Sequence, residues 1–152
     1  MRVQRYDQPS AKWVDVQGED IKADNSGYYS LTLTPGGASS YRVISGSVTS
    51  VPIVLFVRAK VTLKASTKKV ALGKKVVLSG VAEPLASGQK VYIQRKSGSS
   101  WKTVATVTAS ASGAFSYAWK PTAKGTYVLR AWADGNDDVF SGNSGTVTVA
   151  VK

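Results

Sequence analysis

The 152-residue chain contains no cysteine and no histidine, so its possible chemistry rests on carboxylates, hydroxyls, aromatic rings and amines. Thiol nucleophiles, Ser-His-Asp triads and zinc sites with Cys or His ligands are therefore excluded. Most acidic residues fall in predicted turns, at Asp24, at Glu83 and from Asp134 to Asp138. Since nothing in this spacing indicates a shared cleft, we do not expect a glycosidase-type pair of carboxylates. The sequence predicts no catalytic residue, no cofactor and no enzyme.

The acidic loop Asp134-Gly-Asn-Asp-Asp138 is the nearest approach to a metal-binding motif. Its density of carboxylates is typical of calcium sites, but it lacks the full EF-hand spacing and the closing glutamate. A turn rich in Asx and glycine residues is the favoured interpretation. We predict no metal site here.

Basic residues give the chain a formal net charge of +11, and they are unevenly distributed. Through Ala59 there are 6 basic and 5 acidic residues, whereas from Lys60 onward there are 14 and 4. Such an excess favours polyanions, with a cell-wall or other anionic polysaccharide as the predicted partner. The alternative is that the lysines keep strand edges soluble. The candidate ligand-binding residues are Lys68, Lys69, Lys74, Lys75, Lys90, Arg95, Lys96 and Lys102, which we expect to line one solvated face.

Specific nucleic-acid binding is not expected, because neither an RNP-type nor a helix-turn-helix pattern is present. Exposed tryptophans could instead stack on sugar rings. Trp13 and Trp101 stand at matching places in two related stretches, so packing is favoured for both. Trp119 shares a strand face with two other aromatic residues and is expected to be buried. Trp119 and Trp132 have no tryptophan counterpart in the first unit, and either one is the better binding candidate if it is exposed.

The elements that must position these side chains are short strands separated by turns, because no window shows a sustained helical period. One stretch occurs twice: Gly27, Ser30, Pro35 and Tyr41 recur at an offset of 86 as Gly113, Ser116, Pro121 and Tyr127. This internal repeat predicts paired strands, including one from Tyr28 to Thr34. The longest apolar run, from Val51 to Val57, is too short to span a bilayer, so no transmembrane segment is expected.

The repeat divides the chain into a truncated unit, residues 1–58, and a complete unit of about seven strands, residues 59–152. Nothing before Val3 matches the stretch from Lys60 to Gln89, so the first unit lacks two opening strands. Such a unit has an open inner face and unpaired edges. Three explanations stay open: the chain is a fragment of a longer protein, a neighbouring molecule completes the unit in a homodimer, or the unit packs irregularly on the second one.

The repeated motifs resemble those of bacterial Ig-like domains, the tandem modules of secreted and surface proteins. In the second unit the motifs are Gly80-Val81, Gln89-Lys-Val-Tyr-Ile-Gln-Arg, Trp101-Lys-Thr-Val, Gly113-Ala-Phe, Pro121, Tyr127-Val-Leu-Arg and Thr146-Val-Thr-Val; in the first they are Val3-Gln-Arg, Trp13-Val-Asp-Val, Gly27-Tyr-Tyr, Pro35 and Tyr41-Arg-Val.

The resemblance implies an all-β fold of tandem Ig-like β-sandwiches, the first lacking its two opening strands. Tyr41 and Tyr127 look similar to the tyrosine corner of such sandwiches. The implied function is a non-catalytic extracellular or cell-surface spacer or adhesion module of a bacterial protein. The alternative is a binding module for an anionic or carbohydrate polymer through the basic second unit.

Overall fold

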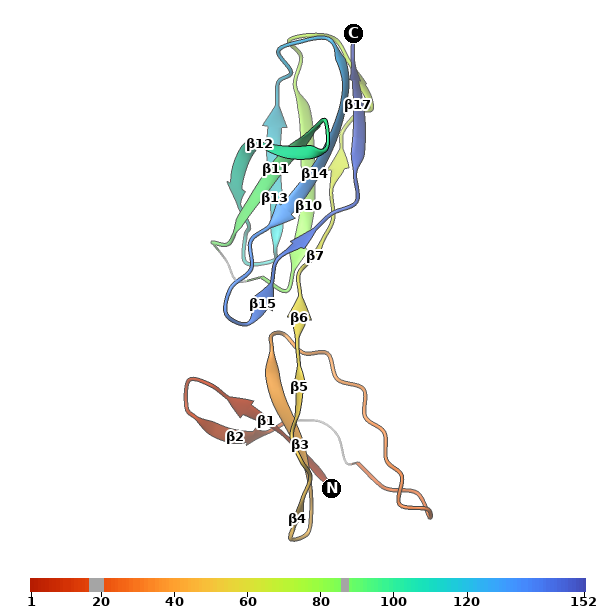
Figure 1. Ribbon diagram of the computed structural model, residues 1–152, viewed down its shortest axis with the longest axis vertical. Coiled ribbons are helices and arrows are strands. Elements are labelled where there is room, and N and C mark those ends of the chain that lie inside the picture. Colours follow the sequence, from red (N-terminus) through yellow and green to blue (C-terminus); the bar gives the residue numbers. More distant parts are fainter. Residues whose placement is uncertain (17–20, 86–87) are drawn as a thin grey trace. The chain divides into compact units, whose positions relative to one another are not determined.

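The computed structural model describes residues 1–16, 21–85 and 88–152, and these residues form strands, turns and extended segments without a helix. They therefore include no helix that is long and apolar enough to cross a membrane. The chain divides into two compact units, Met1–Val57 and Arg58–Lys152 (Figure 1). The fold is all-β, as predicted.

The second unit is a sandwich of two sheets (Figure 1). One sheet has the order β13-β10-β7, with β8 also paired to β10; the other has the order β12-β11-β14-β17-β9, with β16 paired to β14. The first sheet consists of β7 (Lys60–Val61), β8 (Lys64–Ala65), β10 (Val76–Glu83) and β13 (Ala114–Trp119). The second consists of β9 (Lys69–Val70), β11 (Lys90–Ser97), β12 (Ser100–Thr108), β14 (Gly125–Ala133), β16 (Gly142–Asn143) and β17 (Val147–Val151). A further strand, β15 (Val139–Phe140), pairs with β6 (Val57–Arg58), where this unit begins.

Alternating apolar residues build the core between the two sheets. Successive side chains of a strand point to opposite faces, so every second residue can be buried. Val76 and Leu78 of β10, Ile93 of β11, Leu129 of β14 and Val149 of β17 are all fully buried. The two sheets therefore meet through their apolar faces, as in an Ig-like sandwich.

A tyrosine corner fastens the start of β14. The Tyr127 hydroxyl donates a hydrogen bond of 2.8 Å to the carbonyl oxygen of Ala123. Its ring packs edge-on against Trp119, with the ring centroids 5.0 Å apart. Trp119 and Phe115 are both buried, as expected for this strand face. The sequence-based interpretation of Tyr127 is confirmed.

The first unit contains one sheet with the order β2-β1-β3-β4, and β5 pairs with β3. Its strands are β1 (Arg2–Asp7), β2 (Lys12–Asp15), β3 (Ser39–Ser45), β4 (Val48–Thr49) and β5 (Ile53–Leu55). Val3, Ile21 and Tyr41 form its buried cluster. Only partly buried apolar residues surround this cluster in the described chain, so the core is small.

Strand pairing corrects the prediction for Tyr41. Tyr41 of β3 lies opposite Arg5, just as Leu129 of β14 lies opposite Arg95. Tyr41 is therefore the counterpart of Leu129, a core residue, and its assignment as a second tyrosine corner was wrong. The sequence repeat aligns Tyr41 with Tyr127, whereas strand pairing aligns it with Leu129, two residues further on. A shift of two residues keeps a side chain on the same face of a strand, so the apolar pattern does not distinguish the two alignments.

The predicted strand from Tyr28 to Thr34 was also wrong, because no strand occurs there. The turn that precedes it is nevertheless the same in both units. Asp24 N–H donates to the Tyr28 carbonyl (2.8 Å) and Gly27 N–H donates to the Asp24 carbonyl (3.0 Å). The same two bonds, each of 2.9 Å, close the turn over residues 110–114. Gly27 has φ +84° and its counterpart Gly113 has φ +73°, a conformation that favours glycine.

The difference lies in what runs beside each segment. In the second unit the residues after the turn form β13 because β10 pairs with every residue of that strand. Strand structure consists of bonds to a neighbour, and the first unit has no described counterpart of β10. Residues 28–33 therefore run past the sheet without joining a ladder.

Candidate functional site

The outward face of β12, β11 and β14 in the second unit brings aromatic and polar side chains together. Tyr92 lies opposite Trp132, and Lys96 lies opposite Trp101. Because Ile93 and its inward-facing neighbours are fully buried in the core, the alternate residues must point outward. We call this surface the outer face, and it comprises Lys90, Tyr92, Gln94, Lys96, Trp101, Arg130 and Trp132.

Direct contacts hold the rings of the outer face in place. The Tyr92 and Trp132 rings lie 5.1 Å apart between centroids and are tilted by 40°. The Arg130 guanidinium lies 4.2 Å above the centroid of the Trp101 ring, and its Nε donates a 2.9 Å hydrogen bond to Gln94 Oε1. All three rings are half-buried, so each leaves part of its surface to solvent. Such amphipathic rings can stack on the apolar faces of sugars.

The first unit repeats the arginine–tryptophan stack. The Arg42 guanidinium lies 4.2 Å above the Trp13 ring, and its Nε and Nη2 donate hydrogen bonds of 2.9 and 2.7 Å to Gln4 Oε1. Tyr6 packs edge-on against Trp13 with centroids 5.4 Å apart. Trp13 and Trp101 thus each pack against an arginine, yet both rings are half-buried on the solvent-facing side of their sheets and are not core residues. Sequence reasoning missed the glutamine and the arginine, although both recur in the matching strands.

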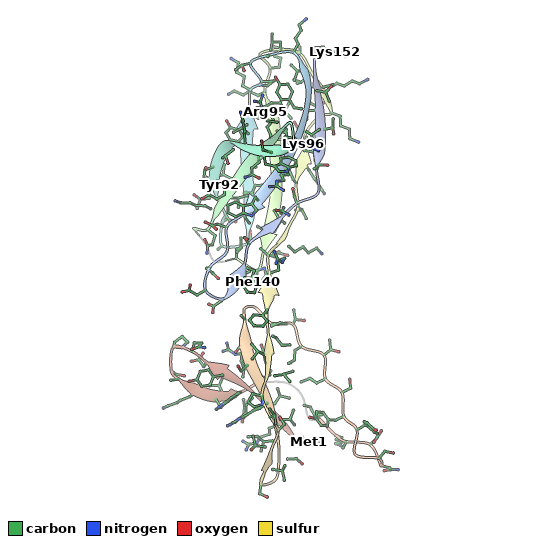
Figure 2. All side chains as sticks on the ribbon, in the orientation of Figure 1. Met1, Tyr92, Arg95, Lys96, Phe140 and Lys152 are labelled. Atoms are coloured by element: carbon green, nitrogen blue, oxygen red, sulfur yellow. The ribbon has the colours of Figure 1, made fainter. Side chains whose placement is uncertain are left out.

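The eight predicted binding residues do not share one face. Lys90 and Lys96 lie on the outer face, together with Tyr92. Figure 2 labels Tyr92, Arg95 and Lys96 on the ribbon. Arg95 and Lys102 lie opposite each other on the other side of the same two strands, since that side alternates with the outer face. The remaining four are exposed at other places: Lys68 and Lys69 at β9, and Lys74 and Lys75 in the segment before β10.

Arg95 is directed toward the core side of its strand. Its Cζ lies 5.8 Å from the centroid of the Tyr127 ring, and its Nε is buried without a hydrogen-bond partner among the described residues. A residue in this position serves packing near the tyrosine corner. It is the weakest of the eight candidates for contact with a polymer.

The acidic loop forms an Asx turn. The Asn136 side-chain oxygen accepts hydrogen bonds from the backbone N–H groups of Asp138 (2.9 Å) and Val139 (2.8 Å). In the part of the chain that the structure describes, no three His, Cys, Asp or Glu side chains gather as a metal site would require. The loop geometry therefore follows from Asn136 and needs no ion.

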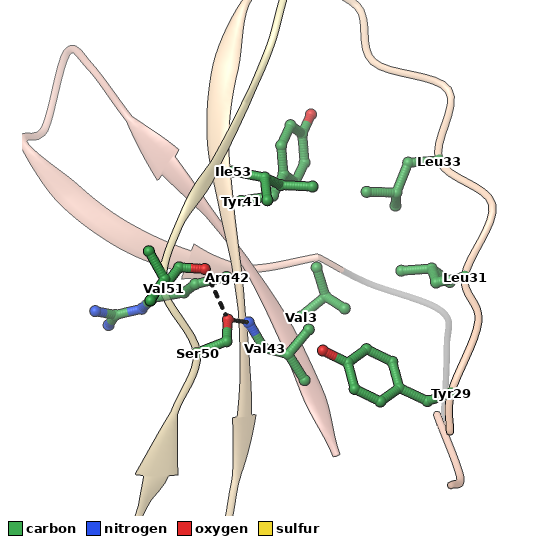
Figure 3. A pocket seen from close by; sticks show the side chains of 10 residues that line it. All are labelled: Val3, Tyr29, Leu31, Leu33, Tyr41, Arg42, Val43, Ser50, Val51 and Ile53. Atoms are coloured by element: carbon green, nitrogen blue, oxygen red, sulfur yellow. Dashed lines mark hydrogen bonds between the residues drawn. The ribbon is translucent and has the colours of Figure 1, made fainter. Parts of the chain in front are cut away.

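A second candidate site is an apolar groove of about 220 Å³ in the first unit (Figure 3). Residues of the 28–33 segment form one wall, and the inward face of the sheet forms the other. Figure 3 shows Tyr29, Leu31 and Leu33 facing the sheet across this space. The lining residues are Val3, Tyr29, Leu31, Leu33, Tyr41, Arg42, Val43, Ser50, Val51 and Ile53.

No protein-family model and no curated protein matches the chain. Two solved structures resemble it distantly. The human OSCAR ligand-binding domain is 16% identical with a TM-score of 0.40, over 97% of this chain and 82% of that one. An engineered protein solved at 1.98 Å is 17% identical with a TM-score of 0.42, over 62% of this chain and 20% of that one. Likenesses this weak indicate neither a ligand nor an activity for the present chain.

Proposed function

We propose that the chain is a non-catalytic adhesion module of an extracellular bacterial protein, and that its outer face binds an anionic carbohydrate polymer. The observation that carries this proposal is the combination of Tyr92 and Trp132 with Lys90 and Lys96 on one face of neighbouring strands. Rings stack on sugars, while ammonium groups attract carboxylate, sulfate or phosphate groups. The resemblance of the repeated motifs to bacterial Ig-like domains supports the extracellular setting.

The excess of positive charge in the second unit supports attraction to any polyanion, but it does not select a binding surface. Only residues within about 8 Å of a bound charge retain most of their effect at physiological salt. Lysines on the outer face should therefore matter more for a polymer bound there than lysines elsewhere. The experiment must separate this local effect from net charge.

The test compares two double variants with the same change in charge. Lys90→Glu with Lys96→Glu alters the outer face, whereas Lys74→Glu with Lys75→Glu alters the segment before β10. Binding to an anionic cell-wall polymer, to a sulfated polysaccharide and to a neutral polysaccharide is measured by affinity electrophoresis over a salt series. At about 0.15 M salt we expect the first variant to lose about tenfold in affinity, equivalent to about 1.4 kcal/mol, and the second at most about twofold.

A single variant, Trp132→Ala, tests the aromatic contribution. It should weaken binding to the neutral and the anionic polymers alike, because stacking does not depend on charge. Equal losses in the two charge variants would show a general effect of net charge and would refute the outer face as the binding site. If the polymers retard the wild-type chain no more than they retard an unrelated basic protein, polymer binding is refuted and the spacer function is favoured.

A further inference from the structure

The inner face of the first unit exposes apolar side chains that its sheet directs inward. Ile53 pairs with the buried Tyr41 and so lies on the same face, yet it is 59% exposed. Tyr29, on the opposite wall of the groove, is 46% exposed, whereas its repeat counterpart Phe115 is 5% exposed. In the first unit, no described strand covers the place that β10 covers in the second unit.

The second unit shows what provides that cover. There β10 runs antiparallel to β13, with Val76 opposite Trp119, Leu78 opposite Tyr117 and Gly80 opposite Phe115. Val76 and Leu78 are fully buried. Gly80 has no room for a side chain, because a Cβ atom there would overlap the Thr62 carbonyl oxygen and lie 2.7 Å from the Phe115 ring.

We propose that the groove of the first unit binds an added extended strand with the side-chain pattern of β10, antiparallel to residues 28–33. The shared turn and the sequence repeat transfer the pairing of β10 with β13 to this segment. The bound strand carries branched apolar residues opposite Leu33 and Leu31 and a small residue opposite Tyr29. Its backbone pairs with the edge of the segment, which no described strand pairs with, and its alternate side chains fill the groove.

A second copy of this chain is the less suitable donor. Its strand of the required chemistry, β10, is already paired with β13 on one side and with β7 and β8 on the other. The inward residues of β10 are fully buried, so releasing the strand would open its own sandwich. The expected occupant is therefore an extended strand that has the side-chain pattern of β10 and no sandwich of its own to open.

The probe is a synthetic peptide with the sequence of residues 75–83, KVVLSGVAE, added to the intact chain. Binding is followed by residue-resolved NMR, and backbone hydrogen exchange is measured with and without the peptide. We expect saturable binding and slowed exchange of alternate amides in residues 28–33, since an antiparallel ladder on one side bonds every second amide and protects it from water. A peptide with Asp in the place of Leu78 is the control and should bind at least about tenfold more weakly, because it would bury a charge.

Two neighbouring residues of β5 supply matched variants. Ile53 lines the groove, whereas Val54 points to the other side of the strand, and both are more than half exposed. Ile53→Asp should weaken peptide binding about tenfold and Val54→Asp at most about twofold. Both substitutions are at exposed positions, and an unchanged spectrum of the free chain verifies that each variant is folded.

Three results would overturn the inference. The first is the absence of binding at a peptide concentration of about 1 mM, because a Kd above this value would mean only very weak association. The second is binding that Ile53→Asp leaves unchanged, because the peptide would then act elsewhere, for example at β13 in place of β10. The third is a dimer in light scattering that protects residues 28–33 without peptide, which would make the second copy the occupant. This test is independent of the outer face, since no residue of the second unit is altered.

Discussion

Gly80 and its surroundings show how a single residue lets neighbouring segments of one sheet approach closely. A Cβ atom at this position would overlap the Thr62 carbonyl oxygen and lie 2.7 Å from the Phe115 ring. Gly80→Ala should therefore lower the free energy of unfolding by roughly 1–3 kcal/mol, the usual cost of overpacking. Denaturant titration measures this loss. Gly145→Ala is the control in the same unit, since nothing lies within 4 Å of its Cβ position; a loss there above about 0.5 kcal/mol would contradict the packing argument.

Asp7 illustrates a residue-scale effect of hydrogen bonding on titration. Its Oδ2 accepts bonds from the Ser10 hydroxyl (2.6 Å) and the Ser10 N–H (3.2 Å). These bonds to Ser10, together with the charge of Arg5, hold the pKa of the Asp7 carboxyl below its ordinary value. The stabilisation is thus present above the ordinary pKa and is lost as the pH falls through the lowered one. NMR titration should show the Asp7 pKa rising toward its ordinary value in Ser10→Ala; an unchanged pKa would contradict this cause.

At the scale of elements, the two copies of the repeated stretch differ in secondary structure: one forms the strand β13, whereas residues 28–33 form no strand. β13 is held in a ladder by β10, whereas residues 28–33 follow the same turn without a strand partner. We predict that the amides of β13 that donate to β10, which are every second amide of this edge strand, exchange slowly with solvent and that the amides in residues 28–33 exchange rapidly. Hydrogen exchange followed by NMR on the free chain checks this. Strong protection of residues 28–33 in a monomer would show a ladder that the structure lacks.

The same comparison explains how far the sequence leads. Alternation of apolar residues and the absence of a helical period predicted the all-β fold and the strands of the second sandwich. Alternation could not reveal that Tyr28 to Thr34 fails to form a strand, because it reports a buried face and not the presence of a neighbour. The register of Tyr41 was missed for a related reason, since a shift of two residues leaves the pattern intact.

For the candidate site the sequence was less informative. Charge identified Lys90 and Lys96 correctly as exposed basic residues, but it could not separate them from Arg95 on the opposite side of the strand. The stack of Arg130 on Trp101 joins residues of two different strands that are not consecutive in the chain. Contacts of this kind depend on strand order, which a single sequence does not contain.

At the scale of the whole molecule, the two units differ in the size of their cores. In the described part of the first unit the buried apolar cluster is Val3, Ile21 and Tyr41, whereas residues from seven strands fill the core of the second. Because stability grows with buried apolar area, we expect the first unit to unfold at a lower urea concentration. The indole signals of Trp13 and Trp132 report the two units separately in an NMR urea titration. One coincident transition would show that the units unfold together.

A peptide that completes the first unit should shift only the first of these transitions. Binding to the folded form alone raises its stability with ligand concentration, and at a hundredfold excess over Kd the gain is about 2.7 kcal/mol. The Trp13 midpoint should therefore move to higher urea in the presence of the 75–83 peptide, while the Trp132 midpoint stays in place. Movement of both midpoints would point to a general effect of the peptide.

The closed turn at Asp24 and Gly27 has a practical consequence. It holds the start of residues 28–33 in the same conformation as the start of β13, so the backbone edge is presented before any partner arrives. A short tag with the pattern of β10, fused to a cargo protein, would then be captured without chemical cross-linking. The unit and the tag together would make a split reporter, whose assembly reads out the meeting of two cargo molecules.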